Sequence, residues 1–76
     1  MNNVFVLVWK SNGRSDDIEV FESDRACIRR ARKIIDKYYG SDMREQSINV
    51  LDEHMYYATT DDGNDTIEIT QHVVYF

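Results

Sequence analysis

Apolar and polar positions at the start of the chain have the pattern of two strands. Residues 4–9 are six consecutive apolar positions, and residues 17–21 alternate between acidic and apolar side chains before Phe21. β-Branched and aromatic residues favour strands, and the Asn12-Gly13 dipeptide between the two segments is typical of a tight hairpin turn. We therefore expect the chain to open with two antiparallel strands.

The turn fixes which side chains share a face of the sheet. A two-residue turn places Leu7 opposite Ile18. In the same register Phe5 is opposite Val20, and these four side chains share one face. The other face then carries Val4, Val6, Val8, Phe21, Asp17 and Glu19. A bulge in the turn would exchange these assignments, because a one-residue shift moves every side chain of a strand to the opposite face.

The next segment has the three- and four-residue spacing of an amphipathic helix. Ser23 is a good N-cap, and Asp24 adds a negative charge to the first turn. Gly40 is a typical residue just after a helix end. The helix is therefore predicted from about Asp24 to Tyr39. Its apolar stripe consists of Cys27, Ile28, Ala31, Ile34, Ile35 and Tyr38. Such a helix covers one face of a sheet.

Three further strands are predicted in the C-terminal half. A polar connection, residues 41–46, precedes a strand at residues 47–51. Asp52-Glu53 is a predicted turn before the strand at residues 54–59. Residues 61–65 form a loop by composition, and residues 66–70 alternate before 73–76 close the chain. The predicted fold is α+β: a single helix packed on an antiparallel sheet, in the order β-β-α-β-β-β. With 76 residues, the chain has room for one domain, residues 1–76.

Charge adds a second pattern to this fold. The net charge is −5, from 14 acidic and 9 basic residues, which argues against binding of nucleic-acid phosphates by the molecule as a whole. Most of the bases lie in the predicted helix: Arg25, Arg29, Arg30, Arg32, Lys33 and Lys37. From residue 41 onwards there are eight acids and one base. Two oppositely charged surfaces are therefore expected.

Few side chains suggest chemistry. Cys27 is the only cysteine, which excludes an intramolecular disulfide. Neighbouring arginines could activate its thiol. Its place on the apolar stripe of the helix instead predicts a buried structural residue. His54 and His72 lack a short metal-ligand spacing, and the acids around Gly63 do not fit a calcium loop. No catalytic residue, metal or cofactor is predicted, so the chain is interpreted as non-enzymatic.

Candidate contact residues lie on the C-terminal strands and their loop. They are Tyr56, Tyr57, Asp61, Asp62, Asp65 and Glu68. Spaced carboxylates can imitate a phosphate backbone and compete for a basic groove, although solubility also explains acids at turns. The alternative surface is the basic helix face formed by Arg25, Arg29, Arg32 and Lys33. It could bind nucleic acid or an acidic protein, or be an ordinary solvated helix face.

One helix cannot cover both faces of a sheet. The first strand is apolar at every position, whereas a sheet covered on one side should alternate. We expect the side away from the helix to expose an apolar and aromatic surface for a partner or for self-association; shielding by the chain's own tail or loops is the alternative. The aromatic residues available to this surface are Phe21, Tyr56, Tyr57, Tyr75 and Phe76.

The N-terminal residues give no sign of export. They lack the charged start, the longer apolar stretch and the cleavage site of a signal peptide. No apolar run approaches the roughly 20 residues of a membrane span. A cytoplasmic protein without membrane contact is expected, and a free thiol suits that compartment.

The layout of an apolar strand, an Asn-Gly turn, a returning strand, a capped helix and an acidic, Tyr-rich C-terminal hairpin resembles the small early proteins of bacteriophages. It is similar in particular to anti-CRISPR and related anti-defence inhibitors, and to phage inhibitors of host polymerase. The resemblance is one of architecture and brings no functional residue with it. It implies an inhibitor that blocks a host protein in the host cytoplasm, such as a nucleic-acid-handling defence complex, by steric occlusion or acidic mimicry. A small nucleic-acid-binding regulator and a ligand-sequestering homodimer are the alternatives.

Overall fold

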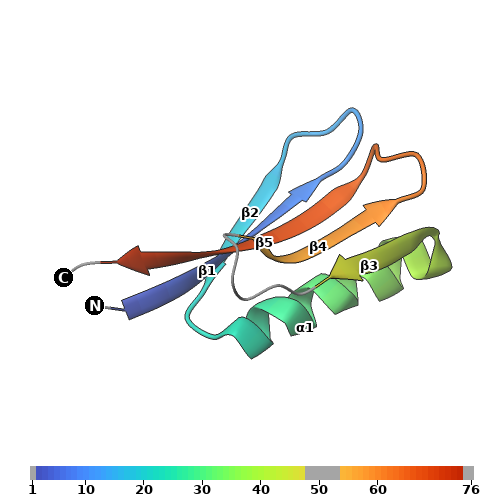
Figure 1. Cartoon of the computed structure of the whole chain (residues 1–76). Helices are drawn as coiled ribbons and strands as arrows, with labels where there is room; N and C mark the ends of the chain where they lie inside the picture. The colour runs from blue at the N-terminus through green and yellow to red at the C-terminus, as the bar shows by residue number, and fades with distance from the viewer. Residues whose placement is uncertain (1, 48–53, 75–76) are drawn as a thin grey trace.

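The described residues form five strands and one helical segment, in the predicted order β-β-α-β-β-β (Figure 1). The computed structural model describes residues 2–47 and 54–74. The elements are β1 (Asn2–Lys10), β2 (Asp17–Phe21), α1 (Asp24–Ile34), β3 (Met43–Ser47), β4 (His54–Thr60) and β5 (Thr66–Val74). The strands form one antiparallel sheet in the order β2-β1-β5-β4-β3. The predicted α+β fold is therefore confirmed.

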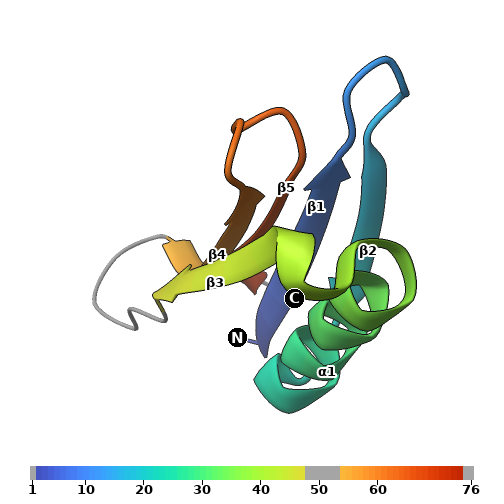
Figure 2. The same cartoon turned by 90° about the vertical axis from the view of Figure 1, so that its right-hand side faces the viewer.

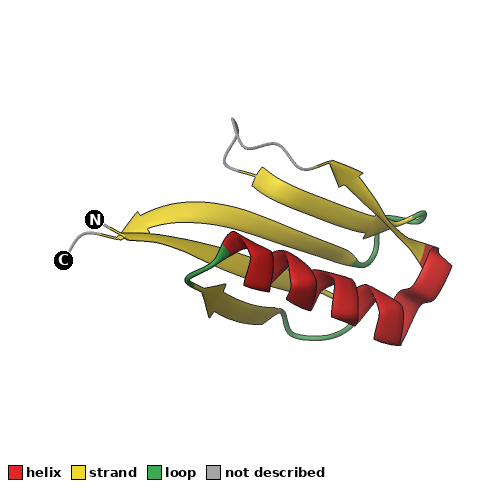
Figure 3. Ribbon diagram, turned by 90° about the horizontal axis from the view of Figure 1, so that it is seen from below, coloured by secondary structure: helices red, strands yellow, loops and turns green. Residues whose placement is uncertain are grey.

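The helix occupies one face of this sheet. Figure 2 shows α1 lying along that face near β1 and β2, with β3 at the opposite edge. In Figure 3 the paired ends of β1 and β5 that carry the two termini extend past the start of the helix. A single helix thus covers the middle of one face, and no other helix lies on the opposite face among the described residues.

Both predicted helix ends are confirmed. The Ser23 Oγ accepts a hydrogen bond from the Ala26 backbone N–H (3.4 Å), as an N-cap should. Gly40 ends the helical segment with a φ of 58°, in the left-handed region that favours glycine. The last five residues, Ile35–Tyr39, form a π-helical turn, η1, before the 3₁₀ turn η2 (Gly40–Asp42).

This π-helical turn changes which tyrosine faces the sheet. A wider turn rotates the residues that follow it around the helix axis. Tyr38, expected on the apolar stripe, is 53% exposed, whereas Tyr39 packs against the core. Its ring lies 6.2 Å from that of Trp9, in an edge-on arrangement.

The core lies between α1 and the covered face of the sheet. It consists of Leu7, Trp9, Cys27, Ala31, Ile34, Ile35, Met43, Tyr56, Ala58, Ile67 and Ile69. Leu7 lies opposite Ile69 in the sheet, and Ala58 lies opposite Ile67. Most of the predicted apolar stripe of the helix contributes to this core, as expected for an amphipathic helix.

The register of the first hairpin differs by one residue from the two-residue turn. Val8 lies opposite Ile18 and Val6 opposite Val20, so the face assignments are exchanged, as in the alternative to the two-residue register. The physical reason is the turn itself. Of the two central turn residues, Asn12 and Gly13, only Gly13 has a positive φ (79°), which fits a type II turn. The two-residue type I′ turn needs positive φ at both central residues. Ile18 and Val20 consequently move to the face away from the helix.

The third strand begins earlier than composition predicts. Residues 41–46 were expected to be a polar connection, but β3 spans Met43–Ser47 and pairs with β4. Met43 is buried and anchors the strand in the core, so tertiary pairing overrides local polarity here. Residues 48–51 of the predicted strand and the Asp52-Glu53 turn lie outside the described residues. β4 and β5 are confirmed, and β5 runs without a break to Val74.

Candidate interaction surfaces

Five β-branched side chains gather on the sheet face that points away from α1. We call them the apolar patch: Val4, Val6 and Val8 of β1 with Ile18 and Val20 of β2. Ile18 and Val20 are each 63% exposed, and the three valines are half-buried. Cross-strand pairing of Val8 with Ile18 and of Val6 with Val20 makes the patch continuous. Contiguous exposed apolar side chains of this kind mark interaction sites.

Polar residues of β5 and β4 border the apolar patch. Glu68 lies opposite Val8, and His72 lies opposite Val4. Glu68 itself has an interaction with another part of the protein. Tyr57 pairs with Glu68 and is 36% exposed, so these two predicted contact residues lie side by side next to the patch. An apolar centre with a polar border is the usual anatomy of a protein interface.

Tyr56 does not lie on this surface. Because side chains alternate along β4, an outward Tyr57 places Tyr56 on the covered face, where it is fully buried. Its hydroxyl makes no hydrogen bond with the described residues. Burial, and then the nearby Glu45 carboxylate, raise the pKa of Tyr56. The prediction of Tyr56 as a contact residue is therefore wrong. Phe21 was also expected on the sheet face that points away from the helix, but it packs against the core.

The Asp65 carboxylate joins three parts of the fold. It accepts hydrogen bonds from the Tyr39 hydroxyl (2.5 Å), the Ser11 hydroxyl (3.1 Å) and the Asn12 backbone N–H (3.2 Å). The Tyr39 hydroxyl in turn accepts one from Trp9 Nε1 (2.8 Å). The Tyr39 hydrogen bond is the main reason that the pKa of Asp65 is lowered. This cluster ties the end of the helix to both hairpin turns, so Asp65, predicted as a contact residue, also has a structural role in the fold.

Asp61 and Asp62 are exposed at the β4–β5 turn. The Asp62 carboxylate accepts hydrogen bonds from the Thr60 hydroxyl (2.6 Å) and the Asn64 backbone N–H (3.0 Å). These bonds, the one from Thr60 first, lower the pKa of Asp62. They also shape the loop, as Asx turns do. The structure therefore divides the six predicted contact residues: three at this turn, with the Asp65 carboxylate engaged in hydrogen bonds, two beside the apolar patch, and Tyr56 in the core.

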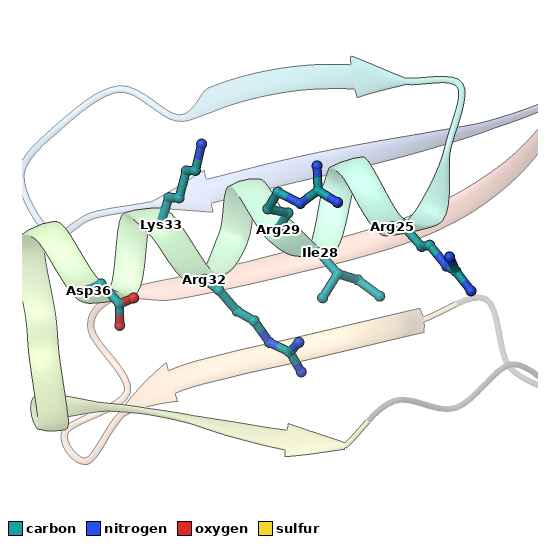
Figure 4. A pocket seen from close by; sticks show the side chains of 6 residues that line it. All are labelled: Arg25, Ile28, Arg29, Arg32, Lys33 and Asp36. Carbon is teal, nitrogen blue, oxygen red and sulfur yellow. The ribbon is translucent and has the colours of Figure 1, made fainter.

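The predicted basic helix face lines a groove. Figure 4 shows the basic groove, an open depression of about 480 Å³ lined by Arg25, Ile28, Arg29, Arg32, Lys33 and Asp36. The structure thus brings all four predicted basic residues together. Arg32 is engaged: its Nε lies 2.9 Å from Glu45 Oε1 of β3, and this hydrogen bond lowers the pKa of Glu45. Arg25, Arg29 and Lys33 are exposed and make no ion pair with the described residues.

The other two basic residues of the helix have different roles. Arg30 Nε lies 3.1 Å from Glu19 Oε2, which links α1 to β2. The Lys37 ammonium lies 5.3 Å from the centre of the Tyr38 ring, within the range of a cation–π contact. Neither belongs to the basic groove.

Cys27 has the properties of a structural cysteine. It is fully buried, and burial, followed by the Glu19 charge, raises its pKa to about 12. A nucleophilic thiol needs the opposite shift and some exposure. Among the side chains that the structure describes, no group of three His, Cys, Asp or Glu residues converges as a metal site would require. The side chain of His54 lies outside the described part.

Within the described residues, no helix is both long and apolar enough to cross a membrane. Comparisons with known proteins give no relative from which a function could be transferred: no family model, no curated protein and no solved structure matches the chain. The surfaces described above are therefore the basis for a functional assignment.

Proposed function

We propose that the chain is a non-enzymatic binding protein that docks onto another protein through the apolar patch. The observation that supports this proposal is the exposure of Ile18 and Val20, 63% each, beside three half-buried valines. Full burial of one such side chain is worth about 1.5–3 kcal/mol. A partner that covers the patch therefore gains affinity from residues that contribute little to the fold.

The acidic residues point to the charge of this partner. Glu68 adjoins the patch, and Asp61 and Asp62 are exposed at the nearby β4–β5 turn. Acidic groups near an apolar centre favour a basic surface and accelerate association with it. Proteins that handle nucleic acid carry such surfaces. We propose that the chain is an inhibitor of the phage-encoded anti-defence class and that it blocks a basic, nucleic-acid-binding site on a host protein.

A capture experiment with two matched variants tests the docking surface. The tagged protein is used to isolate a partner from host lysate, and the affinity of the purified partner is then measured by calorimetry. Ile18→Ser with Val20→Ser should weaken binding at least about tenfold, the equivalent of about 1.4 kcal/mol. Val73→Ser is the control, because Val73 is a 47% exposed apolar residue of the opposite face. Equal affinity of both variants would contradict the proposed surface.

The same partner tests the acidic contribution separately. Asp61→Asn with Asp62→Asn should weaken binding and reduce its salt dependence, because fewer charges attract the basic surface. Asp65 is left unchanged, since its carboxylate holds Tyr39 and Ser11. If affinity and salt dependence were unchanged, acidic mimicry would be excluded as the mechanism of inhibition, and steric occlusion would remain. Sedimentation equilibrium of the protein alone identifies the case in which the partner is a second copy.

A further inference from the structure

The basic groove lies on the helix side of the sheet, away from the apolar patch, and the proposed function does not use it (Figure 4). Arg25, Arg29 and Lys33 follow one another at four-residue intervals along α1. At about 1.5 Å per residue, their Cα atoms rise about 6 Å from one to the next. All three side chains are exposed and lack an acidic partner among the described residues. Their Cα atoms form a regular row, from which Arg25 points to the side of Arg32 and Arg29 and Lys33 point to the other side (Figure 4).

Other side chains of the helix border these basic residues and give the groove its shape. In Figure 4, Ile28 and Arg32 point from the helix toward β4 and β3. Arg32 is held there by Glu45, 2.9 Å away, and so closes one side of the groove. Ile28 is half-buried and gives the groove an apolar side chain, while Asp36 is the one acidic residue among the described residues that line it. Four bases against one acid give the groove a local charge opposite to the net charge of −5.

We propose that the basic groove binds an acidic peptide segment of a partner protein in an extended conformation. Alternate side chains of an extended strand point the same way and are about 6.7 Å apart, close to the spacing of the basic row. Carboxylates at alternate positions can therefore meet successive basic side chains. The guanidinium groups of Arg25 and Arg29 suit this recognition, because each can donate two parallel hydrogen bonds to one carboxylate.

An acidic peptide fits the groove better than nucleic acid. Single-strand binding relies on aromatic side chains that stack with bases, and among the described residues no aromatic side chain lines the groove. A long polyanion would also meet the negative charge of the rest of the protein, including exposed Asp61 and Asp62. A short peptide contacts the groove alone, and an apolar residue between its acids can rest on Ile28.

Fluorescence anisotropy with defined probes tests this assignment on the intact protein. The probe is a labelled octapeptide that alternates Glu and Val, and the comparison probe alternates Gln and Val. Arg29→Ala with Lys33→Ala removes two charges of the row. Lys10→Ala with Arg44→Ala is the control, because it removes the same charge from exposed residues outside the groove. A thymidine oligonucleotide tests the nucleic-acid alternative.

The acidic peptide should bind, and the Gln peptide should bind at least about tenfold more weakly. The groove variant should lose about five- to thirtyfold in affinity, since two exposed charge contacts contribute up to about 1 kcal/mol each. The control variant should lose less than about threefold.

Three results would overturn the proposal: equal binding of the two peptides, equal loss in the two variants, or tighter binding of the oligonucleotide with dependence on Arg29 and Lys33. A dimer that sedimentation detects in the wild type and not in the groove variant would assign the groove to a second copy instead. Because the groove variant changes only Arg29 and Lys33 and leaves the apolar patch intact, either proposal can fail without the other.

Discussion

The two faces of the sheet are built from similar residues in different environments. On the face that α1 covers, Leu7, Ile67 and Ile69 are fully buried. On the other face Ile18 and Val20 are equally apolar but 63% exposed. One helix covers only one face, and the hairpin register decides which side chains of β2 lie on it. Burial thus separates the residues that stabilise the fold from those available for binding.

Cysteine reactivity should show the largest difference between the faces. Cys27 is fully buried with a pKa of about 12, against an ordinary 9.0, so its thiolate fraction at pH 8 is about 1000-fold lower. A cysteine placed on the far face by Val20→Cys, with Cys27→Ser, should react freely with a thiol reagent. Stopped-flow absorbance measures both rates. Similar rates for the two positions would mean that α1 does not protect Cys27.

The next largest difference is expected in the loss of stability when Leu7 and Val6, two neighbouring residues of β1, are each changed to Ala. Leu7→Ala removes a fully buried side chain, and its free energy of unfolding should fall by about 3 kcal/mol. Val6→Ala, one position along and on the far face, should cost less than about 1 kcal/mol, because Val6 is only half-buried. Urea denaturation gives both values. Equal losses would show that the two faces are buried alike.

The contribution of Asp65 to the free energy of unfolding should depend on pH. Its pKa is lowered in the folded protein, so its stabilisation is complete above its ordinary pKa and disappears as the pH falls through the folded value. At pH 7, Asp65→Asn should cost about 1 kcal/mol through its hydrogen bonds to Tyr39, Ser11 and Asn12. The difference from wild type should shrink below about pH 4. Asp61→Asn, at an exposed position of the same loop, is the control and should change the free energy of unfolding little at pH 7.

The smallest effect is expected at Tyr56, one of the two inward-facing tyrosines. The Tyr56 hydroxyl is buried without a hydrogen bond, so Tyr56→Phe should leave the free energy of unfolding within about 0.5 kcal/mol of wild type or raise it. Tyr39→Phe should lower it by about 1 kcal/mol, since this hydroxyl bonds both Trp9 and Asp65. A larger loss for Tyr56→Phe than for Tyr39→Phe would contradict this description of the core.

Local signals in the sequence were sufficient for the helix and most strands. The side chain of Ser23 and the backbone freedom of Gly40 act within a few residues, so the helix ends could be predicted. The hairpin register could not, because Asn12-Gly13 is compatible with more than one turn type. The position of β3 depends on Met43 reaching a core formed by distant residues, which no local pattern contains.

The candidate surfaces were predictable to a similar degree. The four residues of the predicted basic face are three or four positions apart along one helix, so their shared face could be predicted from the sequence. The groove beside it could not, because it also depends on Arg32 being held by Glu45 of β3. The roles of Tyr56 and Asp65 depend on strand alternation and on contacts across 26 or more residues of sequence, such as Tyr39 with Asp65 and Ser11 with Asp65. Composition alone identified both residues as surface contacts because it contains no information on such pairing.

Solvent paramagnetic relaxation of methyl groups tests most directly that α1 shields one face and leaves the other free. A soluble gadolinium chelate is added to the protein labelled at Ile, Leu and Val methyls, at several protein concentrations. Ile18 and Val20 methyls should relax strongly at the lowest concentration, whereas those of Leu7 and Ile69 should be protected. Equal protection of both sets at every concentration would contradict the account, because another part of the chain would then cover the apolar patch.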